Sequence, residues 1–364
     1  MSKKEINLNF DKSAPLLEVE DLKMYFHTED GVVKAVNGVS YTLEAGRTIG
    51  IVGESGSGKS VTAMTLMGLI DMPPGKIEGG DVRYKGASLI EVDEKELRKV
   101  RGNKIAMIFQ DPMTSLNPVY RIGHQLAEPL RVHKGMKKKE AWARAVELLR
   151  LVGIPSPEQR VKEYPHQFSG GMRQRAMIAM ALACDPDILI ADEPTTALDV
   201  TIQAQIIQLM QDLQKKSNSA IVMITHDLGV VADIANDVLV MYAGRPVEYG
   251  SIEDVFYNPS HPYTWGLMGS IPQSIADSGK REEKVELLPI EGMPPSLIDL
   301  PSGCAFHPRC PYAKEICKQQ DPAMKELGDG SHKKHSARCH FAGDAEFTKE
   351  KMEAIAFAHV GGDA

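Results

Sequence analysis

The sequence predicts an α/β fold built around a parallel β-sheet, and three observations support this prediction. Short apolar runs, among them Ile105–Phe109, Ile188–Ala191 and Ala220–Thr225, are typical of strands that are buried on both faces. Segments with helical apolar spacing alternate with these runs, as in chains that form parallel β–α units. The opening stretch Leu16–Leu43 instead alternates apolar and polar residues between turn residues, which favours a separate antiparallel sheet.

The first part of the chain contains the predicted antiparallel strands and the start of the parallel sheet. Residues 1–15 are polar and end at Pro15, so we expect a disordered leader. Thr28-Glu29-Asp30-Gly31 has the composition of a turn, and Asn37-Gly38 that of a second, hairpin turn. The predicted strands are Leu17–His27, Val32–Val36, Val39–Leu43, Thr48–Val52 and Asp81–Tyr84, and the predicted helices are Val61–Ile70 and Asp93–Val100.

The middle of the chain changes character. Residues 120–168 contain no strand signal, and the segment Glu140–Val152 places Ala141, Ala145 and Leu148 on one stripe of a helix. These observations predict a helical insertion between two strands. A helix over about Ile202–Lys216 and short strands at Val238–Tyr242 and Val247–Tyr249, around a turn at Gly244, complete the predicted unit.

Composition and charge narrow the classes of function. Lys and Arg number 42 against 49 Asp and Glu, so the formal net charge of −7 argues against a broad nucleic-acid-binding surface. No apolar run approaches the roughly 18 residues that a membrane-spanning helix needs. The segment Met1–Asp11 lacks the apolar core of a signal peptide. We therefore expect the chain to stay in the compartment where it is made and to reach a membrane only through partners.

A glycine-rich loop between Thr48–Val52 and Val61–Ile70 is the strongest local signal. It reads G-x-x-x-x-G-K-S between a strand and a helix, which is the pattern of a nucleotide phosphate-binding loop. Its backbone N–H groups and the helix N-terminus can surround phosphate oxygens. Lys59 is expected to reach the outer phosphates, and the Ser60 hydroxyl to bind Mg²⁺. The predicted ATP-binding residues are Gly53, Glu54, Ser55, Gly56, Ser57, Gly58, Lys59, Ser60 and Val61.

Two carboxylates follow the buried run Ile188–Ala191. Asp192 stands at the end of a predicted parallel strand, where phosphoryl chemistry needs a second anchor for Mg²⁺. Glu193 comes next and can deprotonate a water molecule that attacks the γ-phosphate. The sequence therefore predicts a metal site at Ser60 and Asp192 and a catalytic base at Glu193.

A further motif makes a family resemblance specific. Phe168-Ser169-Gly170-Gly171-Met172-Arg173-Gln174-Arg175 opens a predicted helix and resembles the signature motif of the ATP-binding cassette (ABC) ATPases. Other motifs of that family occur in the family's order across residues 16–255. They are Phe26 or Tyr25 at the adenine-stacking position, Gln110 in the Q-loop, Ala197-Leu198-Asp199 as the D-loop and His226 as the switch histidine.

This resemblance implies an ABC nucleotide-binding domain with a parallel core sheet, an antiparallel β subdomain and a helical subdomain at about residues 111–168. It implies that two chains pair head to tail, so that the signature of one chain contacts ATP on the other. The signature residues concerned are Ser169, Gly170 and Gly171. Gln110 would contact Mg²⁺ or the attacking water, and His226 the γ-phosphate, so both are catalytic candidates. Met172 stands where the family usually has glutamine and removes its polar contacts.

A narrower resemblance covers nearly the whole chain. Phe109–Pro118, His261–Thr264 and Gly303–Pro311 resemble segments of the peptide/nickel importer ATPases. Phe168–Met172 and Val200–Gln205 match best the D-type ATPase subunit of oligopeptide and dipeptide permeases. This resemblance implies a bacterial peptide importer with two transmembrane permease subunits, a second related ATPase that forms a heterodimer with this chain, and an extracellular peptide-binding protein. The chain would lie at the cytoplasmic face of the cell membrane, bound through the permeases.

Three alternatives stay open at this point. The same type of ATPase could import nickel or another small substrate, because this subunit does not contact the substrate. A soluble ABC ATPase acting on DNA or ribosomes is disfavoured, because the chain is acidic and has one cassette without a long coiled coil. An iron–sulfur sensor that uses ATP only for assembly is disfavoured by the presence of Asp192, Glu193 and His226.

The C-terminal part of the chain, which we place at residues 256–345 before a tail at 346–364, is rich in cysteine. It contains four of the five cysteines, Cys304, Cys310, Cys317 and Cys339. Four thiolates suit zinc or an iron–sulfur cluster, and their spacing is wider than that of usual zinc sites. The family resemblance implies a 4Fe–4S cluster, with Zn²⁺ or four unligated thiols as alternatives. Further candidate ligands are His307, His332 and His335, whereas Cys184 is expected to be a core residue.

Overall fold

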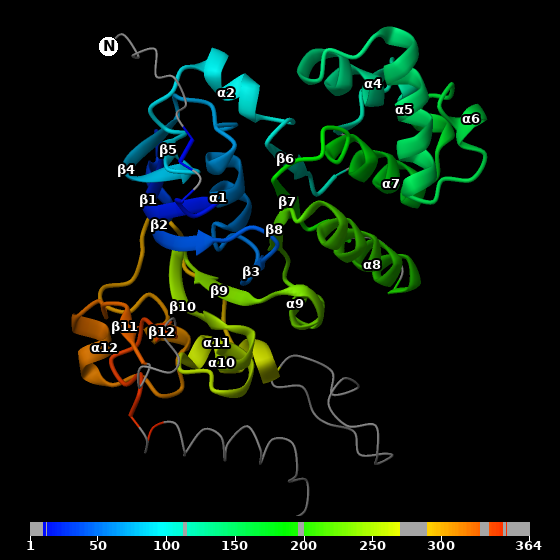
Figure 1. The fold of residues 1–364 in the computed structure, drawn as a ribbon. Coiled ribbons are helices and arrows are strands. Elements are labelled where there is room, and N and C mark those ends of the chain that lie inside the picture. The colour runs from blue at the N-terminus through cyan, green and yellow to red at the C-terminus, as the bar shows by residue number, and fades with distance from the viewer. Residues whose placement is uncertain are drawn as a thin grey trace, which may run out of the picture.

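Two β-sheets and a group of helices build the molecule (Figure 1). The computed structural model describes residues 10–11, 13–111, 115–195, 200–269, 290–327, 335–344 and 347. The predicted leader at residues 1–15 lies largely outside this set, and so do the predicted tail at 346–364 and the D-loop residue Asp199. Within the described residues, no helix has both the length and the apolar character needed to span a bilayer.

The larger sheet has its parallel strands on one side and its antiparallel strands on the other. Strands β9, β3, β8, β7 and β6 lie side by side in this order and run parallel. Their bounds are β3 (Thr48–Val52), β6 (Ile105–Ile108), β7 (Ile188–Asp192), β8 (Ala220–Ile224) and β9 (Asp237–Tyr242). Every residue of these strands is buried, as their apolar composition predicts. Ile224 pairs with both Ile51 and Asp192, so the carboxyl ends of β3, β8 and β7 meet at one edge.

The opening stretch forms a separate antiparallel sheet, as predicted. Its strand order is β2-β1-β4-β5, with β1 (Leu17–Thr28), β2 (Gly31–Leu43), β4 (Gly75–Tyr84) and β5 (Ala87–Ser88). The predicted turn after Thr28 is confirmed, but the predicted hairpin turn at Asn37-Gly38 is wrong. Leu22 pairs with Val39 and Lys23 with Asn37, which leaves Gly38, at φ 88°, as an extra residue. Strand β2 absorbs the glycine as a bulge and continues.

The segment between β6 and β7 is helical, and Figure 1 shows it as a lobe beside the sheets. Its helices are α4 (Ile122–His133), α5 (Lys138–Leu151), α6 (Pro157–Arg160), the 3₁₀ turn η1 (Pro165–Gln167) and α7 (Gly170–Ala181). The predicted stripe of α5 is buried, and Ala141, Ala145 and Leu148 share a core with Ile178 of α7. Helices α1 (Lys59–Leu66), α2 (Glu94–Val100), α8 (Val200–Ser217) and α9 (Leu228–Ile234) lie outside this lobe.

The C-terminal extension lies at the end of the larger sheet that is opposite to strand β6 (Figure 1). Strand β10 (Arg245–Ser251), which precedes the extension, pairs with β9, and the extension strands β12 (Ser336–Ala337) and β11 (Lys325–Glu326) continue the sheet. The helices here are α10 (Ile252–Tyr257), α11 (Pro262–Gly269), the 3₁₀ turn η3 (His307–Arg309) and α12 (Glu315–Gln319). The ring of Tyr242 in β9 lies 4.7 Å from that of Tyr263 and 5.2 Å from that of Phe306, so extension and sheet share one core.

Candidate nucleotide-binding site

The glycine-rich loop joins the buried strand β3 to helix α1, as its sequence predicts. Two of its glycines are required by close contacts. A Cβ atom on Gly53 would lie 2.2 Å from the carbonyl oxygen of Met241, and one on Gly58 would lie 2.2 Å from that of Ala35. Both glycines also have positive φ angles, of 149° and 99°. The loop is therefore held tightly between β2 and β9 in a form that only glycine allows.

Lys59, the first residue of α1, is 5% exposed and lies over the loop. Its Nζ donates hydrogen bonds to the carbonyl oxygens of Gly53 at 2.7 Å and Glu54 at 3.0 Å. Burial lowers the pKa of Lys59, and the charges of three acidic residues, Glu193, Asp192 and Glu54, partly oppose this effect. The ammonium group is thus placed where it can exchange loop carbonyls for phosphate oxygens.

Asp192 ends strand β7 and lies next to the loop. It is 3% exposed, and its Oδ1 accepts a hydrogen bond from the Ser60 hydroxyl at 2.9 Å. Burial raises the pKa of Asp192, and the charge of Glu193 adds to this effect, whereas Ser60 and Lys59 oppose it. A carboxylate and a hydroxyl side by side form the start of an oxygen-ligand set that suits Mg²⁺.

Glu193 gathers the other predicted catalytic residues. Its carboxylate accepts a hydrogen bond from Gln110 Nε2 at 3.0 Å, and its Oε1 lies 3.4 Å from His226 Nδ1. Gln110 follows β6 and His226 follows β8, so both side chains lie at the carboxyl ends of strands and contact one carboxylate. Glu193 itself has a φ of 46°, an unusual value for a residue with a side chain. Strained backbone of this kind is common at functional sites.

An open cavity of about 350 Å³ joins the phosphate loop to Gln110 and Glu193. It is lined by Phe26, Val33, Ala35, Ser55, Gly56, Gly58, Lys59, Ser60, Val61, Gln110, Glu193 and Leu297. Of the two aromatic residues predicted for the base, Phe26 lines this cavity, whereas the Tyr25 hydroxyl is hydrogen-bonded to Asn37. Leu297 comes from the C-terminal extension, and no local sequence pattern indicates its presence here.

The structure places the signature residues away from this cavity. Ser169 caps helix α7, its Oγ accepting a hydrogen bond from the backbone N–H of Met172 at 3.3 Å. Ser169 and Gly170 are exposed, and a Cβ atom on Gly170 would meet no described atom within 4 Å. Helix α7 belongs to the lobe beside the sheets (Figure 1). Its N-terminus therefore faces outward rather than toward the loop of its own chain.

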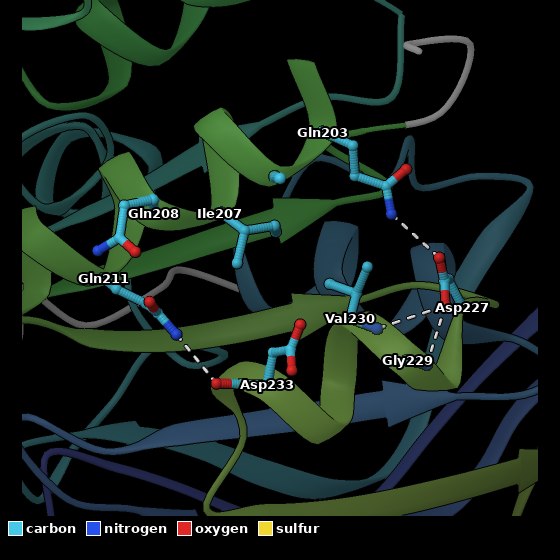
Figure 2. Close-up of a pocket in the computed structure, with 9 residues that line it drawn as sticks. Gln203, Ile207, Gln208, Gln211, Asp227, Gly229, Val230 and Asp233 are labelled. Atoms are coloured by element: carbon cyan, nitrogen blue, oxygen red, sulfur yellow. Dashed lines mark hydrogen bonds between the residues drawn. The ribbon is translucent and has the colours of Figure 1, made fainter. Parts of the chain in front are cut away.

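Sequence reasoning missed the contacts that hold the His226 loop. Figure 2 shows Gln203 of α8 pointing toward Asp227, the residue after His226. Gln203 Nε2 donates to Asp227 Oδ2 at 3.0 Å, while Asp227 Oδ1 accepts from Gly229 N at 2.9 Å and Val230 N at 3.3 Å. Asp227 is thus the N-cap of α9 and a link to α8. The cap could have been found from an Asp that precedes an apolar segment, but the link could not.

Glu54 of the loop has partners in the extension that the sequence analysis also missed. Its carboxylate is paired with Arg309, and its backbone N–H donates to the Tyr263 hydroxyl at 2.8 Å. Arg309 stands 255 positions after Glu54 in the chain. No periodicity or motif spacing relates residues so far apart.

The four predicted cluster cysteines line one small cavity in the extension, together with His307. Burial is the main cause that raises the pKa of Cys304 to about 11 and that of Cys310 to about 12. Among the described residues, no group of three or more His, Cys, Asp or Glu side chains has the geometry to hold a metal ion. His335 instead contacts the buried carboxylate of Glu248 at 2.9 Å. His332 lies outside the described residues, and Cys184 is a buried core residue, as predicted.

Comparison with protein families agrees with the motifs. Residues 36–196 match the family model described as ABC transporter. Residues 247–317 match the one described as oligopeptide/dipeptide transporter, C-terminal region. The second match covers most of the extension segment that carries Arg309 and the first three cluster cysteines.

Curated relatives and solved structures extend this likeness. The chain is 55% identical to the oligopeptide transport ATP-binding protein OppD of Bacillus subtilis (strain 168), over 86% of each chain. It is 56% identical to the dipeptide transport ATP-binding protein DppD of Lactococcus lactis subsp. cremoris, over 86% of this chain and 88% of that protein. Among solved structures, the dimeric post-hydrolysis state of the ATP-binding cassette MJ0796, bound to ADP and Pi, matches with a TM-score of 0.59 and 27% identity. This match covers 65% of this chain and 98% of that one.

Proposed function

This chain belongs to the ABC transporter family, in its oligopeptide and dipeptide branch, and from this premise we propose how its nucleotide site works. The chain is an ATP-binding subunit that hydrolyses ATP to drive the import of oligopeptides or dipeptides. The observation that carries the catalytic proposal is the convergence of Gln110 and His226 on the carboxylate of Glu193, beside the phosphate loop. The relatives reported above are named for peptide transport, and they give no support to the nickel alternative.

In the proposed binding step, the phosphate loop and Lys59 take up the triphosphate. The Lys59 ammonium leaves the carbonyl oxygens of Gly53 and Glu54 and turns to the outer phosphates, whose charges repay its desolvation. Ser60 and Asp192 would hold Mg²⁺, which would neutralise charge on the phosphates. Phe26, which lines the same cavity, stacks on the base.

In the proposed hydrolytic step, Glu193 is the general base. Its carboxylate takes a proton from a water molecule as the water oxygen bonds to the γ-phosphorus and the bond to the β–γ bridging oxygen breaks. Gln110 and His226 keep the carboxylate in place, and His226 can also donate to the γ-phosphate. The products are ADP and inorganic phosphate.

We propose that the signature at Ser169, Gly170 and Gly171 serves the ATP of a partner ATPase. The exposed, outward-facing N-terminus of α7 supports this arrangement, because a helix N-terminus attracts phosphate. The solved cassette reported above is itself dimeric. Asp199 would lie at the same interface. The partner is a second, related ATPase, and both bind two permease subunits at the cytoplasmic face of the membrane, with an extracellular peptide-binding protein upstream.

The proposed division of the chain follows from these roles. Residues 16–255 form the nucleotide-binding domain, with the helical lobe at about 111–168, and residues 256–345 form the extension. A pull-down of the native membrane complex, with identification of its subunits, tests this assembly. Loss of peptide uptake in a strain lacking the chain tests the substrate.

We also propose that Cys304, Cys310, Cys317 and Cys339 hold a 4Fe–4S cluster, with Zn²⁺ as the alternative. Their gathering around one cavity supports this proposal. A single Zn²⁺ would need all four sulfur atoms at about 2.3 Å from one metal ion, whereas an iron–sulfur cluster would accept sulfur atoms that lie farther apart. Anaerobically purified protein should absorb broadly near roughly 400 nm and contain iron that Cys310→Ser removes and Cys184→Ala retains. A colourless protein with stoichiometric zinc contradicts the cluster.

Glu193→Gln tests the catalytic proposal directly. The assembled complex should lose about 100-fold or more in ATP turnover, because a general base contributes roughly that factor, while Mg²⁺–ATP still binds. Glu44→Gln, an exposed site before β3, is the matched control and should leave turnover unchanged. Wild-type turnover in the Glu193 variant, measured with the partner ATPase also made inactive, would contradict the assignment.

A further inference from the structure

Glu54, the second residue of the phosphate loop, is hydrogen-bonded to the C-terminal extension. Arg309 Nη1 donates to Glu54 Oε2 at 2.7 Å, and Arg309 Nη2 donates to Oε1 at 2.9 Å. This is a two-bond guanidinium–carboxylate pair, the geometry in which arginine binds most specifically. The Tyr263 hydroxyl also accepts the Glu54 backbone N–H at 2.8 Å. The extension thus fixes both the side chain and the backbone of this loop residue.

Arg309 is in turn held from several sides. Its side chain is 5% exposed, and it also donates to the carbonyl oxygens of Glu291 at 2.9 Å and Ile290 at 3.2 Å. Its guanidinium lies 5.7 Å from the ring centre of Tyr242 and 6.0 Å from that of Phe306. An arginine whose hydrogen bonds are engaged and whose guanidinium lies against two aromatic rings loses little further entropy in holding a partner. It is therefore a rigid anchor rather than a mobile surface charge.

The charge of Glu54 gives this anchor a direct effect on nucleotide binding. Glu54 is next to Lys59 in the folded loop, because Lys59 Nζ donates a hydrogen bond to the Glu54 carbonyl oxygen at 3.0 Å. The negative charge of the Glu54 carboxylate would repel a triphosphate bound in the loop. Because Arg309 neutralises it through two hydrogen bonds, the loop can keep an acidic residue beside an anion site.

A second part of the extension reaches the cavity itself. The carbonyl oxygen of Leu297 accepts a hydrogen bond from Lys34 N in β2 at 3.2 Å, and Leu297 lines the cavity together with Phe26. Ile298 lies so near Gly31, at the start of β2, that a Cβ on the glycine would be 2.8 Å from Ile298 Cγ2. In Figure 1, the orange segment rises from the extension to the antiparallel sheet.

We propose that residues 290–309 are a positioning element of the ATP site, in which Arg309 holds the phosphate loop and Leu297 completes the wall beside Phe26. This proposal rests on the proposed function, because the ligand it serves is ATP. Arg309 is a positioning residue that acts through Glu54. Its loss should weaken ATP binding more than it slows hydrolysis, since Asp192, Glu193 and His226 are untouched.

The test compares variants of the full-length chain in its complex. Arg309→Met should raise the Kd and KM for Mg²⁺–ATP roughly tenfold, with kcat at saturating ATP within about 3-fold of wild type. Adding Glu54→Gln to Arg309→Met should restore most of the lost affinity, because the unpaired carboxylate is gone. A purely structural role for Arg309 predicts no such rescue. Leu297→Ala, a change in a half-buried loop, should raise Kd about 3-fold and Leu297→Met should not.

Arg338→Met is the matched control. Arg338 also lies in the extension and donates to the carbonyl oxygens of Pro246 at 3.0 Å and Pro322 at 3.1 Å, with no contact to the loop among the described residues. It should leave the Kd for ATP unchanged. Equal weakening by both arginine variants, or a double variant no better than Arg309→Met, overturns the proposal. If Arg309→Met does not fold, unchanged binding by Leu297→Ala overturns it instead. A wild-type chain that neither binds nor hydrolyses ATP refutes the proposed function itself.

Discussion

The two ends of strand β7 carry the same residue type in opposite electrostatic settings. Asp187 precedes the strand, and its carboxylate accepts hydrogen bonds from the Tyr84 hydroxyl and from Lys85 Nζ, the latter at 2.8 Å. Burial alone would raise its pKa, but the hydrogen bonds from Lys85 and Tyr84 and the lysine charges outweigh burial and hold the pKa below its usual value. At Asp192, burial prevails and the pKa is raised.

The opposite pKa directions distinguish a structural carboxylate, Asp187, from a carboxylate suited to binding a cation, Asp192. Asp187 is neutralised by cationic and hydroxyl groups of its own chain, so its charge stabilises the native state. Asp192 has the Ser60 hydroxyl as a hydrogen-bond partner and the charge of Lys59 in its favour, but burial and a second carboxylate, Glu193, outweigh them. A buried charge with so little compensation costs stability until a cation arrives. Sites of this type are more often functional than structural.

Asp192→Asn should give the largest loss of ATP turnover among these variants. A smaller loss than that of Asp187→Asn would contradict the assignment of Asp192 to the site. We expect ATP turnover to fall about 100-fold or more, because a carboxylate ligand for Mg²⁺ is lost. We expect the nucleotide-free chain to become about 1 kcal/mol more stable, because a buried charge is removed. Steady-state turnover and thermal unfolding in metal-free buffer measure the two quantities. A less stable variant would show that Asp192 is structurally paired after all.

Asp187→Asn should have the opposite profile and a smaller effect. The free energy of unfolding should fall by about 1.5–3 kcal/mol, because hydrogen bonds to a charged group are lost. Turnover of the folded enzyme should stay within about 3-fold of wild type, since the site lies at the far end of β7. Denaturant unfolding and turnover at low temperature distinguish the two effects.

The pH dependence of these two stability differences sharpens the same comparison. The pKa of Asp187 is lowered on folding, so its stabilisation is present above its unfolded pKa of about 3.9 and is lost as the pH falls through the folded pKa. The pKa of Asp192 is raised, so its cost is absent below about 3.9 and grows as the pH rises from there to the folded pKa. The stability difference between Asp192→Asn and wild type should therefore shrink as the pH falls toward about 3.9, whereas that of Asp187→Asn should persist to about 3.9 and shrink only below it.

Much of the fold and of the site follows from local sequence. The buried runs before Gly53, Asp192 and His226 predict parallel strands, and parallel strands bring their carboxyl ends to one edge, so these residues could be placed together. The turn at Asn37-Gly38 failed because a dipeptide composition cannot distinguish a hairpin turn from a bulge in a long strand. The pairing of β2 with β1 determines that Gly38 is a bulge rather than part of a hairpin turn.

The contacts between distant segments could not be predicted. Glu54 and Arg309 are 255 positions apart, and Gln203 of α8 and Asp227, the N-cap of α9, belong to two helices that pack against each other only in the folded chain. Each of these residues has an ordinary composition-based interpretation as an exposed polar side chain. Only the folded arrangement gives Arg309 its 5% exposure and its carboxylate partner.

The pairing of Glu54 with Arg309 limits how this protein can be recombined with its relatives. A hybrid that joins the first 255 residues of one ATPase to the extension of another would combine two halves of one ion pair. Such a hybrid would keep its affinity for ATP only if both parents carried the acidic and the basic partner at these places. The helical lobe is therefore a better part to exchange than the C-terminal extension. Among the described residues, the lobe and the extension belong to separate hydrophobic clusters.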